Sequence, residues 1–131
     1  MVQKVLIEEN ALLSALEAAK NLYPNEFIGL FRGEKRGNEA SSEIILEELI
    51  ITPLSEYREG MSSYQPWLMP VAGREIASFH SHPHPPASPS EADKNLFSRF
   101  LANFISMPPY TPSSTNAFDA NAKKISFTVI K

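Results

Sequence analysis

Hydrophobic residues recur at helical spacing early in the chain. Five small or aliphatic side chains are separated by intervals of three and four residues: Leu12, Ala15, Leu16, Ala19 and Leu22. This spacing places them on one face of an α-helix. Asn10 stands before the stripe as an N-cap, and Pro24 follows it as a stop signal. We therefore predict an amphipathic helix between these two residues.

Apolar runs on both sides of this helix predict a sheet. A short, weakly patterned strand covers residues 2–7, and a buried strand covers residues 27–31. Residues 33–42 are polar and predict a turn, and the run EIILEELIIT at residues 43–52 predicts the second strand of a hairpin. Consecutive strands joined in this way are usually antiparallel neighbours.

Residues 53–70 form the least regular part of the chain. Aromatic residues, prolines and serines are mixed there without a period. A loop of this length in a compact domain is often functional. The alternative is a packed surface loop in which Trp67 covers the core. A strand over residues 74–80 follows it.

A second helix begins at Ser90 and runs to about residue 103. Its inward stripe combines one acidic and five apolar residues: Asp93, Leu96, Phe97, Phe100, Leu101 and Phe104. Residues 104–107 can begin a further strand, and a terminal hairpin turns at residues 119–122. The layout predicts an α/β fold, with a mixed, largely antiparallel sheet sandwiched by helices, in a single domain over residues 1–131.

All three histidines lie within five positions at the end of a predicted strand: His80, His82 and His84. In an extended chain residues i and i+2 project from the same face, so His80 and His82 point together. Two imidazoles held in this way form half of a zinc site, because zinc takes nitrogen ligands at about 2.0–2.1 Å in tetrahedral geometry. His84 follows in a proline-rich turn, and we expect it to be a loop residue.

Asp93 is the candidate for a third ligand. It stands on the inward stripe of its helix, and a buried carboxylate needs a partner because an unpaired buried charge is costly. The proline-rich segment before Ser90 has few conformations to lose, which helps to hold the ligands in place. The simpler alternative is that Asp93 only completes a capping box with Ser90, and that the histidines are ordinary surface or core residues.

These residues together resemble the motif of the JAMM (MPN-plus) zinc metalloproteases, which consists of H-S/T-H-P, a short loop and S-x-x-D. The chain has His80-Ser81-His82-Pro83, a proline-rich loop, and Asp93 with Ser90 three positions before it. The likeness spans about residues 12–129 and points to the short, insertion-free prokaryotic type. It implies the MPN/JAB, cytidine deaminase-like fold.

The resemblance also assigns roles. Zinc would be held by His80, His82 and Asp93, with a fourth position open to a water whose pKa zinc lowers to about 7. The family has a glutamate between the first helix and the next strand, and Glu26 falls at the matching position. Glu26 would be the general base. Ser90 would donate to the oxyanion of the tetrahedral intermediate, besides its possible role as N-cap.

Composition excludes several classes of protein and of functional site. With 131 residues, 43% hydrophobic and 21% charged, the chain fits one soluble globular domain. A net charge of -3 without basic clusters argues against nucleic acid as a partner. The chain has no cysteine, which excludes disulfides, cysteine metal sites and a cysteine nucleophile. It also has no membrane-spanning run and no signal-peptide pattern, so we expect a cytoplasmic protein without a membrane partner.

The resemblance implies a zinc-dependent metalloprotease or isopeptidase. Its substrate would be the amide bond after the C-terminal Gly-Gly of a ubiquitin-like or sulfur-carrier protein. Such a tail could pair along an exposed strand edge, for which residues 59–67 are the candidate. The length is close to the minimum of the family and leaves no room for the long insertions that grip polyubiquitin, which favours a simple modifier.

Two alternatives come from other classes. A non-catalytic MPN scaffold would be expected to have lost one or more of the motif residues, and all of them are present. A peptidase acting on a small peptide or amino-acid adduct of a carrier protein would use the same motif. Nothing in the sequence separates this activity from deconjugation, and nothing in it indicates an oligomeric state.

Overall fold

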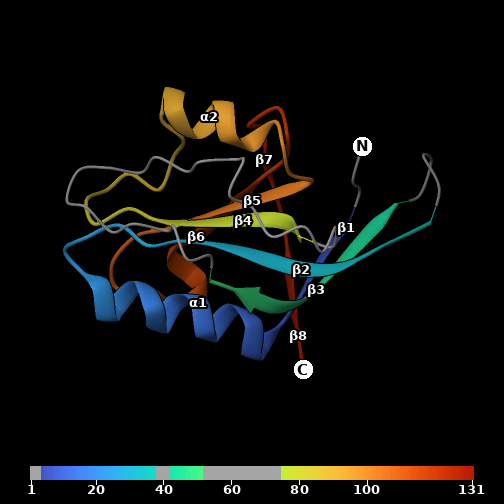
Figure 1. Ribbon diagram of the computed structural model, residues 1–131, viewed down its shortest axis with the longest axis horizontal. Helices are drawn as coiled ribbons and strands as arrows, with labels where there is room; N and C mark the ends of the chain where they lie inside the picture. Colours follow the sequence, from blue (N-terminus) through green and yellow to red (C-terminus); the bar gives the residue numbers. More distant parts are fainter. Residues whose placement is uncertain (1–3, 38–41, 52–74) are drawn as a thin grey trace.

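Two helices lie on opposite faces of one eight-stranded sheet in the computed structural model, which describes residues 4–37, 42–51 and 75–131 (Figure 1). The predicted loop over residues 53–70, with Trp67, lies outside the described residues. Among the residues that are described, no helix is long and apolar enough to cross a membrane.

The strands follow the order β7-β6-β5-β4-β2-β3-β1-β8 across the sheet. In chain order they are β1 (Lys4–Glu8), β2 (Ile28–Arg36), β3 (Glu43–Ile50), β4 (Glu75–Ser81), β5 (Ala102–Ser106), β6 (Thr115–Phe118), β7 (Lys124–Ile125) and β8 (Thr128–Ile130). The β1–β3, β1–β8 and β4–β5 pairs are parallel, and the other four pairs are antiparallel. The predicted mixed α/β sheet is confirmed.

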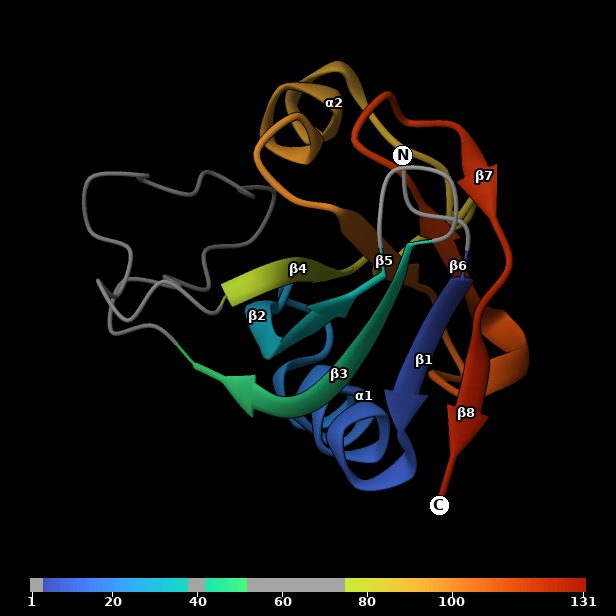
Figure 2. The ribbon, with the colours of Figure 1, turned by 90° about the vertical axis from the view of Figure 1, so that its right-hand side faces the viewer.

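The end of the chain differs from the predicted terminal hairpin. β6 and β7 do form an antiparallel hairpin, but β8 leaves it and pairs in parallel with β1 at the opposite edge of the sheet. Only two residues separate β7 from β8, so the sheet curls until its two edges approach each other (Figure 2). One of these two residues is Phe127, whose ring packs edge-on against Phe104 inside the curl, with 5.2 Å between centroids.

The first helix, α1 (Glu9–Leu22), begins one residue before the predicted cap. Its N-cap is Glu8, the last residue of β1, and no side chain caps the helix. Asn10 therefore lies in the first turn, where its carbonyl accepts a hydrogen bond from Ser14 Oγ at 2.8 Å. The strand enters the helix directly, which leaves no room for a separate cap. The predicted apolar stripe is buried, apart from the half-buried Leu22.

The second helix, α2 (Glu91–Phe97), is shorter than predicted. It ends at Phe97, and Phe104 belongs to β5 instead of the helix. All five residues of β5 are buried, because the strand pairs with β4 on one side and β6 on the other. Phe104 of β5 falls by its spacing on the apolar stripe of the helix, so the sequence pattern predicted a longer helix than the one that forms. In the same way, β2 extends to Arg36, which pairs with Glu43, and shortens the predicted turn.

The two faces of the sheet differ in chemistry. Residues in register across neighbouring strands point to the same face. One face has the apolar row Phe79, Phe104 and Ala117, which belongs to the core that packs on α1. The face toward α2 has two rows that mix polar and apolar residues: His80, Ile105 and Asn116, and Ser78, Asn103 and Phe118.

Asn103 links this polar face to α2. It is fully buried, its Oδ1 accepts a hydrogen bond from Ser78 Oγ, and its Nδ2 donates to the carbonyl oxygens of Phe97 at 3.3 Å and Asp119 at 3.4 Å. The Phe97 carbonyl is at the C-terminal end of α2. Asn103 therefore anchors the end of the helix that lies away from the histidines.

We expect Asn103→Ala to lower the free energy of unfolding by about 1–3 kcal/mol, because it leaves buried polar groups without partners. Urea denaturation would measure the change. Asn95→Ala is the matched control, since Asn95 is exposed on α2 and should shift stability by less than about 0.5 kcal/mol. Equal stability of the two variants would contradict an anchoring role.

Candidate metal centre

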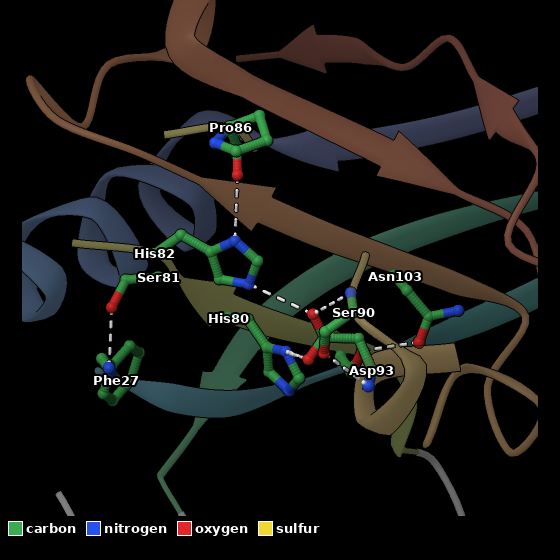
Figure 3. Close-up of polar contacts among 9 residues, drawn as sticks. Phe27, His80, Ser81, His82, Pro86, Ser90, Asp93 and Asn103 are labelled. Carbon is green, nitrogen blue, oxygen red and sulfur yellow. Dashed lines mark hydrogen bonds and ion pairs between the residues drawn. The ribbon is translucent and has the colours of Figure 1, made fainter. Parts of the chain in front are cut away.

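The three predicted ligands meet at one end of β4. His80 is the second-last residue of β4, which ends at Ser81, and His82 is the first residue after the strand. Asp93 lies in the first turn of α2 (Figure 3). One potential ligand atom from each residue lies within 4.8 Å of the other two. His80 Nδ1 is 2.9 Å from Asp93 Oδ1, and His82 Nε2 is 3.2 Å from Asp93 Oδ2. Each carboxylate oxygen thus faces one imidazole.

The cluster is buried on all sides except at His82. The side chains of His80 and Asp93 are 1% exposed, whereas that of His82 is 15% exposed. Both ring nitrogens of His80 are buried without a hydrogen-bond partner among the described residues, and Nδ1 has only the close ion-pair contact with Asp93. A buried imidazole left in this state is unfavourable unless another partner binds it. Two imidazoles and a carboxylate around one point are compatible with zinc.

Asp93 serves the helix and the cluster at the same time. Ser90 Oγ accepts a hydrogen bond from the Asp93 N–H at 3.1 Å, and Asp93 Oδ2 accepts one from the Ser90 N–H at 2.9 Å. This is a complete capping box. Burial alone would raise the pKa of Asp93, but its contacts with His80, His82 and the Ser90 N–H outweigh burial and lower the pKa well below its usual range. Asp93 is therefore a carboxylate at neutral pH.

His82 is oriented from both of its nitrogens. Its Nδ1 lies 3.2 Å from the carbonyl oxygen of Pro86, and its Nε2 lies 3.2 Å from Asp93 Oδ2. Both oxygens can only accept, so a protonated ring donates to each of them, and a neutral ring that binds a metal through Nε2 would keep its proton on Nδ1, toward Pro86. Burial alone would lower the pKa of His82. The hydrogen bonds to Asp93 and Pro86, together with the negative charges of Asp93 and Glu26, raise the pKa above 6.5.

Glu26 lies beside this cluster, in the turn between α1 and β2. Its carboxylate is close enough to act electrostatically on His82, and its Oε1 is buried without a hydrogen-bond partner in the described part of the chain. The neighbouring Phe27 is clamped by Ser81, whose N–H donates to the Phe27 carbonyl at 2.9 Å and whose Oγ accepts from the Phe27 N–H at 2.7 Å. Ser81 thus holds the Glu26 turn against the end of β4.

The remaining motif residues also have definite places. Ser90 is exposed at the start of α2, and His84 is exposed in the loop, outside the cluster. Sequence reasoning missed the supporting groups: the Pro86 carbonyl, Asn103 and the clamp between Ser81 and Phe27. No residue pattern marks them, because their roles depend on strands and loops that are distant in the sequence.

The fold and the His-x-His and Asp cluster define the class of JAMM-type metalloproteases, and the comparisons agree. The family model for prokaryotic homologs of the JAB domain matches residues 8–129. The chain belongs to this family.

Individual relatives are also similar to this chain over most of its length. A probable metalloprotease of Haloferax volcanii is 31% identical over 119 residues, which is 89% of this chain and 74% of that protein. A JAB1/MPN domain protein from Archaeoglobus fulgidus is 27% identical, with a TM-score of 0.67 over 98% of this chain and 100% of that one. A structure described as "JAMM: a metalloprotease-like zinc site in the proteasome and signalosome" is 26% identical, with a TM-score of 0.64 over the full length of both chains.

Without metal, the stability of the protein should depend on pH through His82. Its pKa is higher in the fold than the ordinary 6.5, so protonated His82 stabilises the metal-free fold below pH 6.5, and this contribution is lost as the pH rises through the raised pKa. Asp93 has a lowered pKa, so its contribution is present above about pH 4 and is lost only in acid.

We therefore expect the thermal midpoint of chelator-treated protein to fall, relative to that of His82→Gln, as the pH rises above 6.5. Differential scanning calorimetry from pH 5 to pH 9, with excess chelator, would measure both proteins. Parallel curves for the two would contradict the pairing of His82 with Asp93. Metal should reverse the trend, because it binds the deprotonated imidazole.

Proposed function

We propose that this protein is a zinc-dependent isopeptidase that hydrolyses the amide bond after the C-terminal Gly-Gly of a ubiquitin-like or sulfur-carrier protein. One observation carries the proposal: His80, His82 and Asp93 are assembled around one point, with His80 and Asp93 buried and the Glu26 carboxylate beside them. Membership of a metalloprotease family supports the same reaction class.

Zinc is the metal that the donors favour. Two imidazoles and one carboxylate without cysteine are typical of catalytic zinc sites, which keep one position open. The solved structure described as a metalloprotease-like zinc site supports the same metal here. When bound, zinc would polarise the scissile carbonyl and make water a stronger acid.

Glu26 is the proposed general base. Its buried Oε1 has no hydrogen-bond partner among the described residues, so it is free to accept a proton from the attacking water and to return it to the leaving amine. The anchored backbone next to it keeps the carboxylate near His82. A base held in this way does not need to reorganise before the reaction.

Ser90 can perform both roles that the sequence suggests. Its Oγ accepts from the Asp93 N–H, which uses a lone pair and leaves the hydroxyl proton available. That proton can be donated to the oxyanion that develops on the scissile carbonyl. The capping box fixes the position of the donor before substrate arrives.

The burial of the cluster supports a glycine tail as substrate. His80 and Asp93 are almost completely enclosed, so only a slim backbone can bring its amide to them, and glycine is the slimmest residue because it has no Cβ. The strand edge predicted over residues 59–67 lies outside the described residues. A small adduct on a carrier-protein C-terminus would satisfy the same steric requirement and is the second candidate.

The metal assignment predicts about one zinc ion per chain in untagged protein. His80→Ala should lose this zinc, because it removes one of three ligands, whereas His84→Ala should keep it. His84 is a matched control, since it lies in the same segment but is exposed. Elemental analysis after dialysis would measure both variants. Zinc retained by His80→Ala would contradict the ligand set.

The catalytic assignment predicts that Glu26→Gln keeps its zinc but loses hydrolysis by about 10²–10⁴-fold. The assay would compare a ubiquitin-like or sulfur-carrier protein joined through Gly-Gly to a lysine with a short peptide that has the same amide. Glu17→Gln, an exposed change on α1, is the control.

The protein conjugate and the short peptide distinguish the two candidate activities. Faster cleavage of the protein conjugate supports deconjugation, and cleavage of the peptide alone supports the small-adduct alternative. No cleavage of either substrate by the zinc-loaded protein would leave a scaffold with an unused site.

A further inference from the structure

Asn116 lies in the same row of the sheet as the buried histidine. His80 of β4 pairs with Ile105 of β5, and Ile105 pairs with Asn116 of β6. The three residues therefore project from the same face of the sheet, with Asn116 two strands or about 10 Å from His80. Asn116 is too far from His80 to bind the same metal, but its side chain reaches the segment of the chain that follows His82.

That segment is the proline-rich loop over residues 83–89, which joins His82 to α2. Ala87 is its buried residue, at 4% exposure, and packs against Phe97, Ile105 and Phe118. Asn116 Nδ2 donates a hydrogen bond to the Ala87 carbonyl at 3.0 Å. Among the hydrogen bonds of the described residues, this is the only one that joins the loop to a side chain of the sheet.

The Ala87 carbonyl, which accepts from Asn116, is next in the chain to the Pro86 carbonyl, which contacts His82. The Pro86 carbonyl accepts from His82 Nδ1 at 3.2 Å, while His82 Nε2 lies 3.2 Å from Asp93. Four of the seven loop residues are prolines, which have no N–H with which to hold the loop to the sheet. The position of the Pro86 carbonyl therefore depends on the packing of Ala87 and on the amide of Asn116.

We infer that Asn116 is a positioning residue for the metal centre: it holds the proline-rich loop so that the Pro86 carbonyl keeps the proton of His82 on Nδ1 and leaves Nε2 for the metal. This inference rests on the proposed function. Groups that orient a metal-binding histidine typically affect metal affinity by about 10–100-fold.

The test uses Asn116→Ala and Asn116→Asp. The aspartate has nearly the same shape but cannot donate, so it should behave like alanine if donation to Ala87 is what matters. Asn121→Ala is the control, because Asn121 is exposed in the β6–β7 turn. We expect both Asn116 variants to bind zinc about 10–100-fold more weakly in a chelator competition, and the control to bind it as the wild type does.

A second measurement is independent of zinc. In metal-free protein with ¹⁵N-labelled histidine, at a pH where the His82 ring is neutral, NMR reports how its proton is shared between Nδ1 and Nε2. We expect less of the Nδ1–H form in both Asn116 variants than in the wild type, because the Pro86 carbonyl that favours this form is no longer held in place. Thermal unfolding would confirm that the variants are folded.

An unchanged zinc affinity, or a lowered affinity with an unchanged His82 tautomer, would overturn the role of Asn116. Absence of zinc binding by the wild type would instead overturn the proposed metal centre. The tautomer measurement would still show whether Asn116 orients His82.

Discussion

The Asp93 carboxylate, held between two imidazoles, is the interaction on which the site depends. One of its oxygens faces His80, and the other faces His82 and caps α2. The same side chain thus begins a helix, closes the cluster over the end of β4 and remains ionised despite its burial. A helix of seven residues has little stability of its own. Its start is therefore fixed by the capping box, and its end by Asn103.

Side chains alternate between the two faces of the sheet, so that one face forms the apolar core and the other carries the candidate site. Along β4, Phe79 and Ala77 enter the core under α1, while Ser78 and His80 face α2. The apolar core on one face lets the other face include buried polar residues without loss of the fold. Within that face, asparagines from β5 and β6 donate hydrogen bonds to the two segments next to the candidate ligands: Asn103 to the end of α2, and Asn116 to the loop. The candidate ligands therefore lie close together without a metal.

The parts predicted correctly from the sequence are those governed by local chemistry. The stripe of α1, the strand that ends at the histidines and the Ser90 start of α2 all depend on residues that are close in the chain. The errors occurred where a distant partner decides the conformation. α2 is shorter than predicted because β5, which follows it, pairs with β4 and β6. The predicted terminal hairpin is incomplete because β8 pairs with β1, which is at the other end of the sequence.

The sequence by itself determined the kind of site. Two histidines with a spacing of two, and an aspartate three residues after a helix-capping serine, specify the donors and the elements that present them, because strand and helix geometry act over a few residues. Only the tertiary structure decided that these donors meet within 4.8 Å, that Glu26 lies beside them, that His82 contacts the Pro86 carbonyl, and that Asn116 donates to the Ala87 carbonyl. These contacts join residues as far apart as Glu26 and His82, and their distances are fixed by the packing of the whole sheet.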